Sequence, residues 1–275
     1  MKTLKQCINY LKQTLILYMS AFLFILLLLP DLVYSQTLTI YTEDWPPISY
    51  QANSKMEGMG VEIVQALQAK IGTTEVITMV PWARGYKSLL EEANVMLFSV
   101  GRSVEREKLM TLLGPIAISS TALYTQRGNA ARLLAMGDKI YELPVGAYRG
   151  SIFADTAKKK GFTKLDLAAA PKITANMLFA KRFELWVEGS LAVPSIVKET
   201  GHAPDEVERV MVLDNLELYL AFSKASSPTI IRAWEEALKA IKKDGSFQKI
   251  HQKWLANEPA PMEVLLLNPS SQPTH

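Results

Sequence analysis

From residue 38 onward, apolar positions switch between a period of two, typical of strands, and a period of three to four, typical of helices. The first half of this region predicts a strand, a helix, a strand, a helix and a strand, at 38–42, 60–72, 75–80, 82–92 and 94–100. Strands that alternate with helices are typical of βαβ units. We therefore expect an α/β fold built on a mostly parallel sheet.

The second half of the region predicts longer extended segments and then two helices. Extended segments are expected at 114–126, within 139–151, and at 183–189, 207–213 and 216–224. A strongly amphipathic helix begins after Pro228 and ends at Gly245, and a second helix follows it. Residues 257–275 are rich in proline and have no periodicity, so we predict a loose C-terminal tail.

The N-terminus has the layout of a secretory signal peptide. Three lysines precede an apolar run at 15–29, and small or polar residues end the segment before Gln36. An uncleaved membrane anchor is the alternative, but the run is shorter than the roughly 20 residues that span a bilayer. We therefore predict that residues 1–35 are removed and that the mature protein is periplasmic.

The composition argues against several classes of site. The only cysteine, Cys7, lies ahead of the apolar run, so the mature chain has neither a disulfide nor a thiol nucleophile. The histidines are not at ligand spacing, and no phosphate loop, nucleophile elbow or dinucleotide fingerprint occurs, so we predict no metal, no cofactor and no catalysis. The net charge of +3 comes largely from the first 35 residues, so nucleic acid is not expected as a partner.

Four segments together resemble one family, the family 3 extracellular solute-binding proteins of ABC transporters. They are the aromatic-proline loop YTEDWPPISY, the helix start GMGVEIV, the segment SVGRSVEREKL that leads to LLGPI, and the closing helices from LAFSK to HQKWL. The likeness runs from about Leu38 to Leu255. Each segment alone is a weak signal, and their order and spacing carry the resemblance.

The resemblance implies a two-lobed, type II periplasmic-binding-protein fold, in which each lobe is a mostly parallel sheet flanked by helices. Lobe 1 would comprise 36–122 and 218–256, and lobe 2 would comprise 123–217. Two crossing strands would form the hinge between them. Ligand would bind in the cleft, and the lobes would close over it.

The same resemblance implies an anion site in lobe 1. Arg106 stands where the family's arginine grips a ligand carboxylate, and Ser103 takes the threonine position before it. Ser99 and Gly101 fall on neighbouring contact positions. A planar guanidinium can bind a carboxylate through two parallel hydrogen bonds, which agrees with this role. Arg102 is either a second anion contact or a rim residue.

Aromatic side chains and residues of lobe 2 complete the implied site. Trp45 and Trp82 stand at cleft positions, where they pack either against a ligand or into the core. Arg84 is a further candidate, because it would share the local surface of Trp82. In lobe 2 the candidates match a strand-end segment that meets the ligand from the other side: Tyr148, Gly150 and Ser151.

Gly189 departs from the family pattern, because the amino-acid binders place there an aspartate that holds the ligand's ammonium. Glu188 is adjacent, but strand alternation predicts that its side chain points to the opposite face. Glu43 and Asp44 are the candidates for a negative group from lobe 1. The ligand is therefore an amino acid held differently, or a carboxylate or other small polar compound without that amine.

We predict a monomeric protein that captures a small polar, carboxylate-bearing solute, an amino acid or a related compound, for delivery to an ABC permease. The first alternative is a sensor that signals through a membrane partner. The second is an enzyme, since some members of this fold are periplasmic dehydratases acting on cyclic carboxylates. Such an enzyme needs an acid or base in the cleft, for which Glu188, Glu43 and Asp44 are the candidates.

Overall fold

The computed structural model describes residues 37–269. These residues belong to one structural unit, which begins at Thr37. The predicted signal peptide at 1–35 and the last six residues of the chain lie outside the described residues. Within the described part, no helix is both long and apolar enough to cross a membrane.

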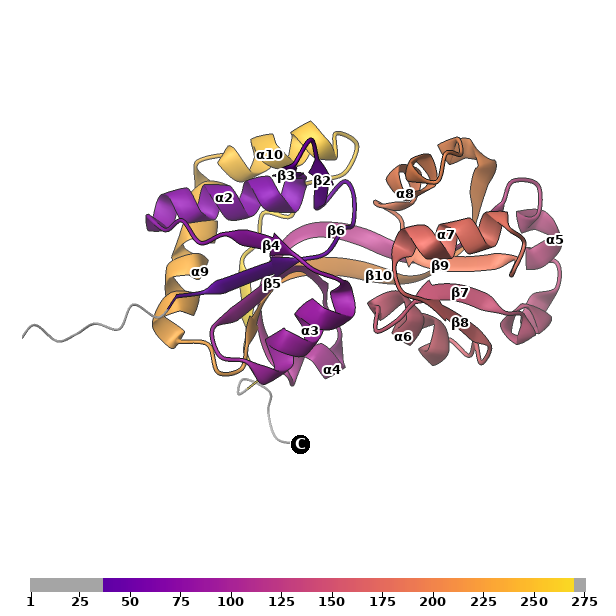
Figure 1. The fold of residues 1–275 in the computed structure, drawn as a ribbon, viewed down its shortest axis with the longest axis horizontal. Coiled ribbons are helices and arrows are strands. Elements are labelled where there is room, and N and C mark those ends of the chain that lie inside the picture. Colours follow the sequence, from indigo (N-terminus) through magenta and orange to yellow (C-terminus); the bar gives the residue numbers. More distant parts are fainter. Residues whose placement is uncertain (1–36, 270–275) are drawn as a thin grey trace, which may run out of the picture. The chain divides into compact units, whose positions relative to one another are not determined.

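One lobe is formed by the beginning and the end of the described chain (Figure 1). Parallel strands lie side by side in the order β4–β1–β5. Helices α2, α9 and α10 pack together, whereas α3 packs against β1 and β5. The bounds of these elements are β1 (Thr39–Thr42), α2 (Met59–Ile71), β4 (Ile77–Met79), α3 (Trp82–Glu91), β5 (Val95–Gly101), α4 (Val104–Glu107), α9 (Pro228–Lys243) and α10 (Ser246–Trp254).

Helix α2 shows how local sequence sets the ends of an element. Its apolar stripe, which includes Val61, Val64 and Leu67, is buried as the spacing predicted. Gly72 ends the helix with a left-handed φ of 82°, and its N–H donates to the carbonyl of Gln68. A two-stranded hairpin precedes the helix, formed by β2 (Tyr50–Ala52) and β3 (Lys55–Glu57).

The other lobe is formed by the middle of the chain (Figure 1). Strand β7 pairs in parallel with both β8 and β9. Ser151 caps the start of the following helix, because its hydroxyl accepts the backbone N–H of Ala154. The elements of this lobe are α5 (Ala130–Leu134), η1 (Gly137–Glu142), β7 (Val145–Tyr148), α6 (Ile152–Lys159), β8 (Leu165–Ala168), α7 (Pro171–Phe179), β9 (Leu185–Gly189), α8 (Val193–Glu199) and η2 (Pro204–Glu206).

Two long strands, β6 (Met110–Gln126) and β10 (Val207–Ser223), run through both lobes and pair antiparallel along their length. The two strands predicted at 207–213 and 216–224 are thus one strand, with register shifts that interrupt its pairing. Ile118, near the middle of β6, is 37% exposed, whereas both ends of β6 are mostly buried. The exposed middle of these strands, where the chain passes from one lobe to the other, is the position expected of a hinge.

The long strands join the two parallel sets into one mixed sheet of nine strands. β10 pairs antiparallel with β5, and β6 pairs antiparallel with β9. The predicted fold class is therefore confirmed as a two-lobed α/β protein with mostly parallel sheets, helices on their faces and a two-strand connection. The antiparallel crossing makes the sheet continuous between the lobes.

The C-terminal segment differs from the predicted loose tail. Leu265–Leu267 form β11, which pairs antiparallel with the first half of β6. Lys242 of α9 holds this segment, because its ammonium donates to the carbonyls of Pro115 at 2.8 Å and Glu263 at 2.6 Å. The expectation is corrected for these residues, because a run of three leucines next to an unpaired strand edge gains backbone hydrogen bonds and burial by joining it.

Candidate functional site

Arg106 is a buried cation without an acidic partner among the described residues. Its side chain is on α4, and the residue is only 4% exposed. Nη1 donates to the carbonyl of Gly101 at 3.0 Å, and the hydroxyl of Ser103 caps α4 by accepting the backbone N–H of Arg106. Within residues 37–269, no carboxylate oxygen lies within 4.0 Å of its guanidinium nitrogens. A buried charge normally has such a partner, so this guanidinium is suited to receive an anion.

Two aromatic rings form the wall behind Arg106. Trp82 is the first residue of α3, and Tyr86 lies one helical turn later, with the two rings stacked at 5.5 Å. The guanidinium carbon lies 5.2 Å from the Trp82 ring centroid and 5.1 Å from that of Tyr86. Trp82 also reaches the other lobe, where its Nε1 donates to the carbonyl of Gly150 at 2.7 Å. These cation–π contacts stabilise the guanidinium without neutralising it.

Glu43 is the acidic group that faces this cation most directly. It follows β1, is 6% exposed, and accepts a hydrogen bond from the Tyr148 hydroxyl of the other lobe at 3.2 Å. Burial raises the pKa of Glu43 to about 8, although the Tyr148 hydrogen bond and the charge of Arg106 both act to lower it. Burial also raises the pKa of Tyr148 well above its ordinary value. At neutral pH the Glu43 carboxyl is therefore mostly protonated.

Glu188 contacts Trp45 from the other lobe but does not itself line the central hollow of the site. Its Oε1 accepts the indole N–H of Trp45 at 3.2 Å and the backbone N–H of Gly189 at 2.9 Å. Burial raises the pKa of Glu188 to about 8, and its buried Oε2 has no hydrogen-bond partner within residues 37–269.

Side chains of both lobes enclose a central hollow of about 10 Å³, which is the space of a single water molecule. Ser99 also lines it, with a left-handed φ of 65° and a buried hydroxyl that has no hydrogen-bond partner in the described part of the chain. A hollow of about 370 Å³ adjoins it through Glu43 and Trp82, and one of about 510 Å³ adjoins it through Arg106. The central hollow is lined by Glu43, Trp45, Trp82, Ser99, Gly101, Arg106, Tyr148, Ile152, Phe153, Leu216 and Leu218.

Residues 38–257 match the family model for bacterial extracellular solute-binding proteins, family 3. The chain belongs to this family. The match covers both lobes and every residue that lines the central hollow. No curated protein sequence matches the chain.

Solved structures with the same fold include binding proteins and a sensor. The sensor domain of a histidine kinase with similarity to periplasmic binding proteins matches with a TM-score of 0.70 at 20% identity, over 81% of this chain and 98% of that one. The arginine-, lysine-, histidine-binding protein ArtJ from Geobacillus stearothermophilus gives 0.69 at 16%, over 81% and 97%. A His/Glu/Gln/Arg/opine family-binding protein from Silicibacter pomeroyi, in complex with lysine, gives 0.68 at 16%, over 82% and 100%.

Two predicted arginines of this solute-binding protein lie outside the central hollow. Arg102 forms ion pairs with Glu107 at 2.6 Å and Glu217 at 3.0 Å, and its side chain is 37% exposed. Of the two roles considered for Arg102, a second anion contact or a rim residue, the geometry therefore favours the rim residue. Arg84 is exposed on α3 and does not line the hollow. Each residue along a helix rotates the side-chain direction by about 100°, so Arg84, two residues after Trp82, points to a different face of the helix.

The remaining predicted residues have other positions around the site. Asp44 is exposed and lines the hollow of about 370 Å³ beside Glu43. The Ser151 hydroxyl is engaged within its own lobe, since it donates to the Tyr148 carbonyl at 2.7 Å and caps α6. Gly150 contributes its carbonyl to Trp82 rather than to the hollow. Among the predicted set, the hollow brings together Glu43, Trp45, Trp82, Ser99, Gly101, Arg106 and Tyr148.

Tyr86 and the apolar lining were not predicted as site residues. The spacing of four between Trp82 and Tyr86 is the signal in the sequence that places both rings on one face of the helix. Phe153 packs edge-on against Tyr148 and tilted against Trp45. Leu216 and Leu218 come from β10, whose distance along the chain from the other residues hides them from sequence reasoning.

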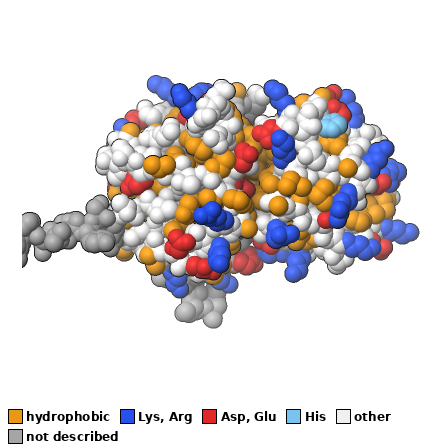
Figure 2. All heavy atoms as spheres, viewed as in Figure 1, with side chains coloured by type: hydrophobic (Ala, Val, Ile, Leu, Met, Phe, Trp, Pro, Cys, Tyr) orange, Lys and Arg blue, Asp and Glu red, His pale blue; other side chains and the backbone are white. Residues whose placement is uncertain are grey.

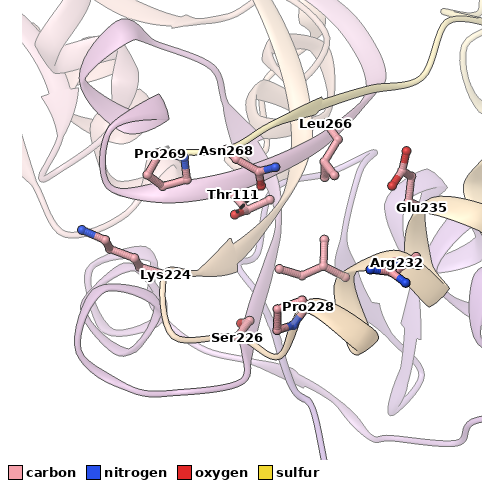
Figure 3. Close-up of a pocket in the computed structure, with 10 residues that line it drawn as sticks. Thr111, Lys224, Ser226, Pro228, Arg232, Glu235, Leu266, Asn268 and Pro269 are labelled. Carbon is pink, nitrogen blue, oxygen red and sulfur yellow. Dashed lines mark hydrogen bonds between the residues drawn. The ribbon is translucent and has the colours of Figure 1, made fainter. Parts of the chain in front are cut away.

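A larger hollow, of about 540 Å³, lies elsewhere, between the start of α9 and the C-terminal segment (Figure 3). Thr111 and Asn268 meet across it at 3.0 Å. It contains none of the predicted site residues, and its Lys224 and Arg232 are surface cations rather than buried ones. The cluster around Arg106 is the better candidate, because buried, incompletely paired charges are typical of binding sites.

Proposed function

We propose that this protein captures a small polar, carboxylate-bearing solute, an amino acid or a related compound, between its lobes and delivers it to an ABC permease in the inner membrane. The observation that carries the proposal is Arg106, a buried guanidinium without an acidic partner among the described residues. A ligand carboxylate would supply the missing charge through two parallel hydrogen bonds. The rings of Trp82 and Tyr86 hold the guanidinium in place for this contact.

Contacts between the lobes support capture by closure. Three hydrogen bonds cross from one lobe to the other beside the hollow: Trp82 to Gly150, Tyr148 to Glu43, and Trp45 to Glu188. Each uses a side chain that also lines the site or lies next to it. A ligand that orders these side chains would favour the closed arrangement, as hinge closure requires.

The lobe assignment is part of this proposal. Lobe 1 comprises 36–122 and 218–256, and lobe 2 comprises 123–217, with the hinge in the exposed middle of β6 and β10. A signal peptide at 1–35 would export the protein to the periplasm, where it acts as a monomer. Family membership supports an extracellular binding role rather than catalysis. ArtJ and the lysine complex support an amino acid or a related compound as the ligand.

The test is a thermal-shift screen of the exported protein against amino acids, dicarboxylates, polyamines and small aromatic acids. A ligand at about 100 times its dissociation constant should stabilise the folded state by about 2.7 kcal/mol. Arg106→Ala should abolish the shift, because loss of one partner of a buried charge pair costs about 2–5 kcal/mol. Arg102→Ala is the matched control and should keep the shift, since Arg102 is paired at the rim. An unchanged shift in Arg106→Ala contradicts the proposal.

A sensor for a membrane signalling partner is the second candidate, favoured by the likeness to a histidine kinase sensor domain. The two roles differ in what the ligand-bound protein does at the membrane. Transport predicts that the purified protein restores uptake of radiolabelled ligand into spheroplasts of a deletion strain. Sensing predicts no uptake, together with ligand-dependent binding to a membrane protein that has a signalling domain.

A further inference from the structure

The place where the amino-acid binders hold the ligand's ammonium is closed in this structure. A Cβ added to Gly189 would lie 2.7 Å from Cζ2 of Trp45 and 3.0 Å from Phe153, so an acidic side chain has no room there. Glu188 does not replace it, because the residue does not line the hollow and its Oε1 already accepts two hydrogen bonds. Among the described residues, β9 therefore presents no acidic group to the central hollow.

The acidic groups lie instead on the first loop of lobe 1. Glu43 lines both the central hollow and the adjoining hollow of about 370 Å³, and Asp44 lines the second. The other walls of this adjoining hollow are mostly apolar: Met79, Val80, Pro81, Trp82, Ala169, Ala170 and Pro171. Acidic and apolar side chains also adjoin where the lobes meet on the face seen in Figure 2.

The charges around this end of the site favour a cation. Glu43 faces the Tyr148 hydroxyl from β7 and feels the charges of Arg106 from α4 and Glu188 from β9. Burial raises the pKa of Asp44, against the opposing charge of Lys172 on α7, and the charge of Asp44 acts on Glu199 of α8. Four carboxyls therefore share this end with two cations, Arg106 and Lys172.

We propose that the site selects an ω-amino carboxylate, with its carboxylate at Arg106, its methylene chain along the apolar hollow, and its ammonium at Glu43 and Asp44. This inference rests on the proposed function. The adjoining hollow shares Glu43 and Trp82 with the central one, and Asp44 and apolar side chains line the rest of it. An unbranched ligand with a charge at each end can contact the guanidinium and these acids at once. An α-amino acid would place its ammonium next to the closed position at Gly189.

Binding of such a ligand exchanges a proton. The Glu43 carboxyl is mostly protonated below a pKa of about 8, and the ligand ammonium would take the place of that proton. The carboxyl O–H bond breaks, the proton leaves to solvent, and the carboxylate pairs with the ammonium. Affinity should therefore rise with pH by up to tenfold per unit until about pH 8 and then level off, because above that pH no proton has to be displaced.

The test compares three five-carbon ligands by isothermal titration calorimetry at pH 6, 7, 8 and 9, using protein expressed from the full-length sequence. 5-Aminopentanoate carries the distant amine, 2-aminopentanoate is its α-amino isomer, and pentanoate has no amine. We expect 5-aminopentanoate to bind at least tenfold more tightly than either of the others. Titration at pH 7 in buffers of different ionisation enthalpy should show release of close to one proton, a readout that needs no variant.

Matched variants locate the effect. Glu43→Gln keeps the shape of the side chain and should weaken 5-aminopentanoate binding about 30-fold or more and remove its rise with pH. Asp44→Asn should weaken it less, because Asp44 is exposed. Glu236→Gln, on the exposed face of α9, should bind as the wild type does.

Equal or tighter binding of 2-aminopentanoate or pentanoate, or an unchanged affinity in Glu43→Gln, overturns the inference and leaves the proposed function standing. The inference is likewise overturned, and the proposed function kept, if none of the three ligands binds while α-amino acids bind and lose that binding in Arg106→Ala. Failure of every carboxylate in the wider panel overturns the proposed function together with the inference.

Discussion

At the scale of single residues, burial sets the chemistry of this site more than the number of charges does. Arg106 is buried, at 4% exposure, beside two aromatic faces and a carbonyl. Glu43 and Glu188 are as deeply buried, but they lack a cationic partner within 4.0 Å in the part of the chain described here, so they hold a proton instead. A guanidinium cannot release its proton, whereas a carboxyl can take one up.

These carboxyls make stability depend on pH. In the unfolded chain both lose their protons near pH 4.5, whereas in the folded protein they keep them to about pH 8. Between these values the folded state binds more protons, so the free energy of unfolding should fall as pH rises, by at most about 1.4 kcal/mol per pH unit for each group. The fall should level off above pH 8. Urea unfolding at pH 5, 6, 7, 8 and 9 measures it.

Glu188→Gln tests the assignment of this pH dependence. Removing one of the two carboxyls should make the fall in the free energy of unfolding between pH 5 and 8 clearly shallower. Glu236→Gln, an exposed glutamate on α9, should leave the slope as it is. Identical slopes in the wild type and Glu188→Gln would show that the carboxyl does not carry the effect.

At the scale of elements, short segments owe their place to the long strands. β6 supplies one edge to β9 and another stretch to β11, while β10 supplies an edge to β5. The three residues of β11 have no periodicity of their own and form a strand because β6 offers them backbone partners. Lys242, buried beneath this segment, holds it through two carbonyls. Burial lowers the pKa of Lys242 to about 8.

Truncation after Asn257 removes β11 and the Glu263 carbonyl that Lys242 uses. The free energy of unfolding should fall by about 2 kcal/mol or more. The truncation removes the apolar area that these leucines bury against the core, and it exposes the edge of β6. Ligand binding should persist, since none of the removed residues lines the central hollow. Truncation after Pro269 is the control and should change little. Equal urea midpoints for the two truncations would contradict a structural role for β11.

At the scale of the whole molecule, the contacts between the lobes differ in how much each stabilises the closed arrangement. The hydrogen bonds of Tyr148 to Glu43 and of Trp45 to Glu188 are buried and that of Trp82 to Gly150 is partly buried, whereas the Lys159–Glu105 ion pair, at 2.6 Å, is more than half exposed on both sides. Exposed ion pairs contribute about 0–1 kcal/mol and weaken with salt. Shielded hydrogen bonds close to the ligand should therefore dominate closure.

Two variants separate these contacts. Trp82→Phe keeps an aromatic face over Arg106 but removes the indole N–H, so ligand dissociation should accelerate about five- to tenfold, as loss of about 1 kcal/mol implies. Glu105→Gln should change the dissociation rate less than about twofold. Stopped-flow tryptophan fluorescence measures both, and small-angle scattering reports whether the ligand-bound form stays closed. A larger effect on the dissociation rate from Glu105→Gln than from Trp82→Phe would contradict this ranking of the contacts.

Local patterns were sufficient where an element depends on its own residues. The helix ended by Gly72, the cap at Ser151 and the amphipathic α9 follow from spacing and capping chemistry. The role expected of Arg106 came from a short motif, and its burial is consistent with that role. These features involve residues within a few positions of one another, so the sequence displays them directly.

Tertiary structure decided the features that need residues far apart in the chain. The sequence alone determined the alternation of strands and helices, the fold class and the candidate anion site around Arg106. Only the folded chain brought Glu43 to Tyr148 and Trp45 to Glu188, 105 and 143 residues apart, and the second contact ties Glu188 to a residue that lines the central hollow. It also closed the space at Gly189 and paired Arg102 with Glu107 and Glu217. Burial and pairing depend on what the other lobe supplies, and no local pattern of residues encodes that.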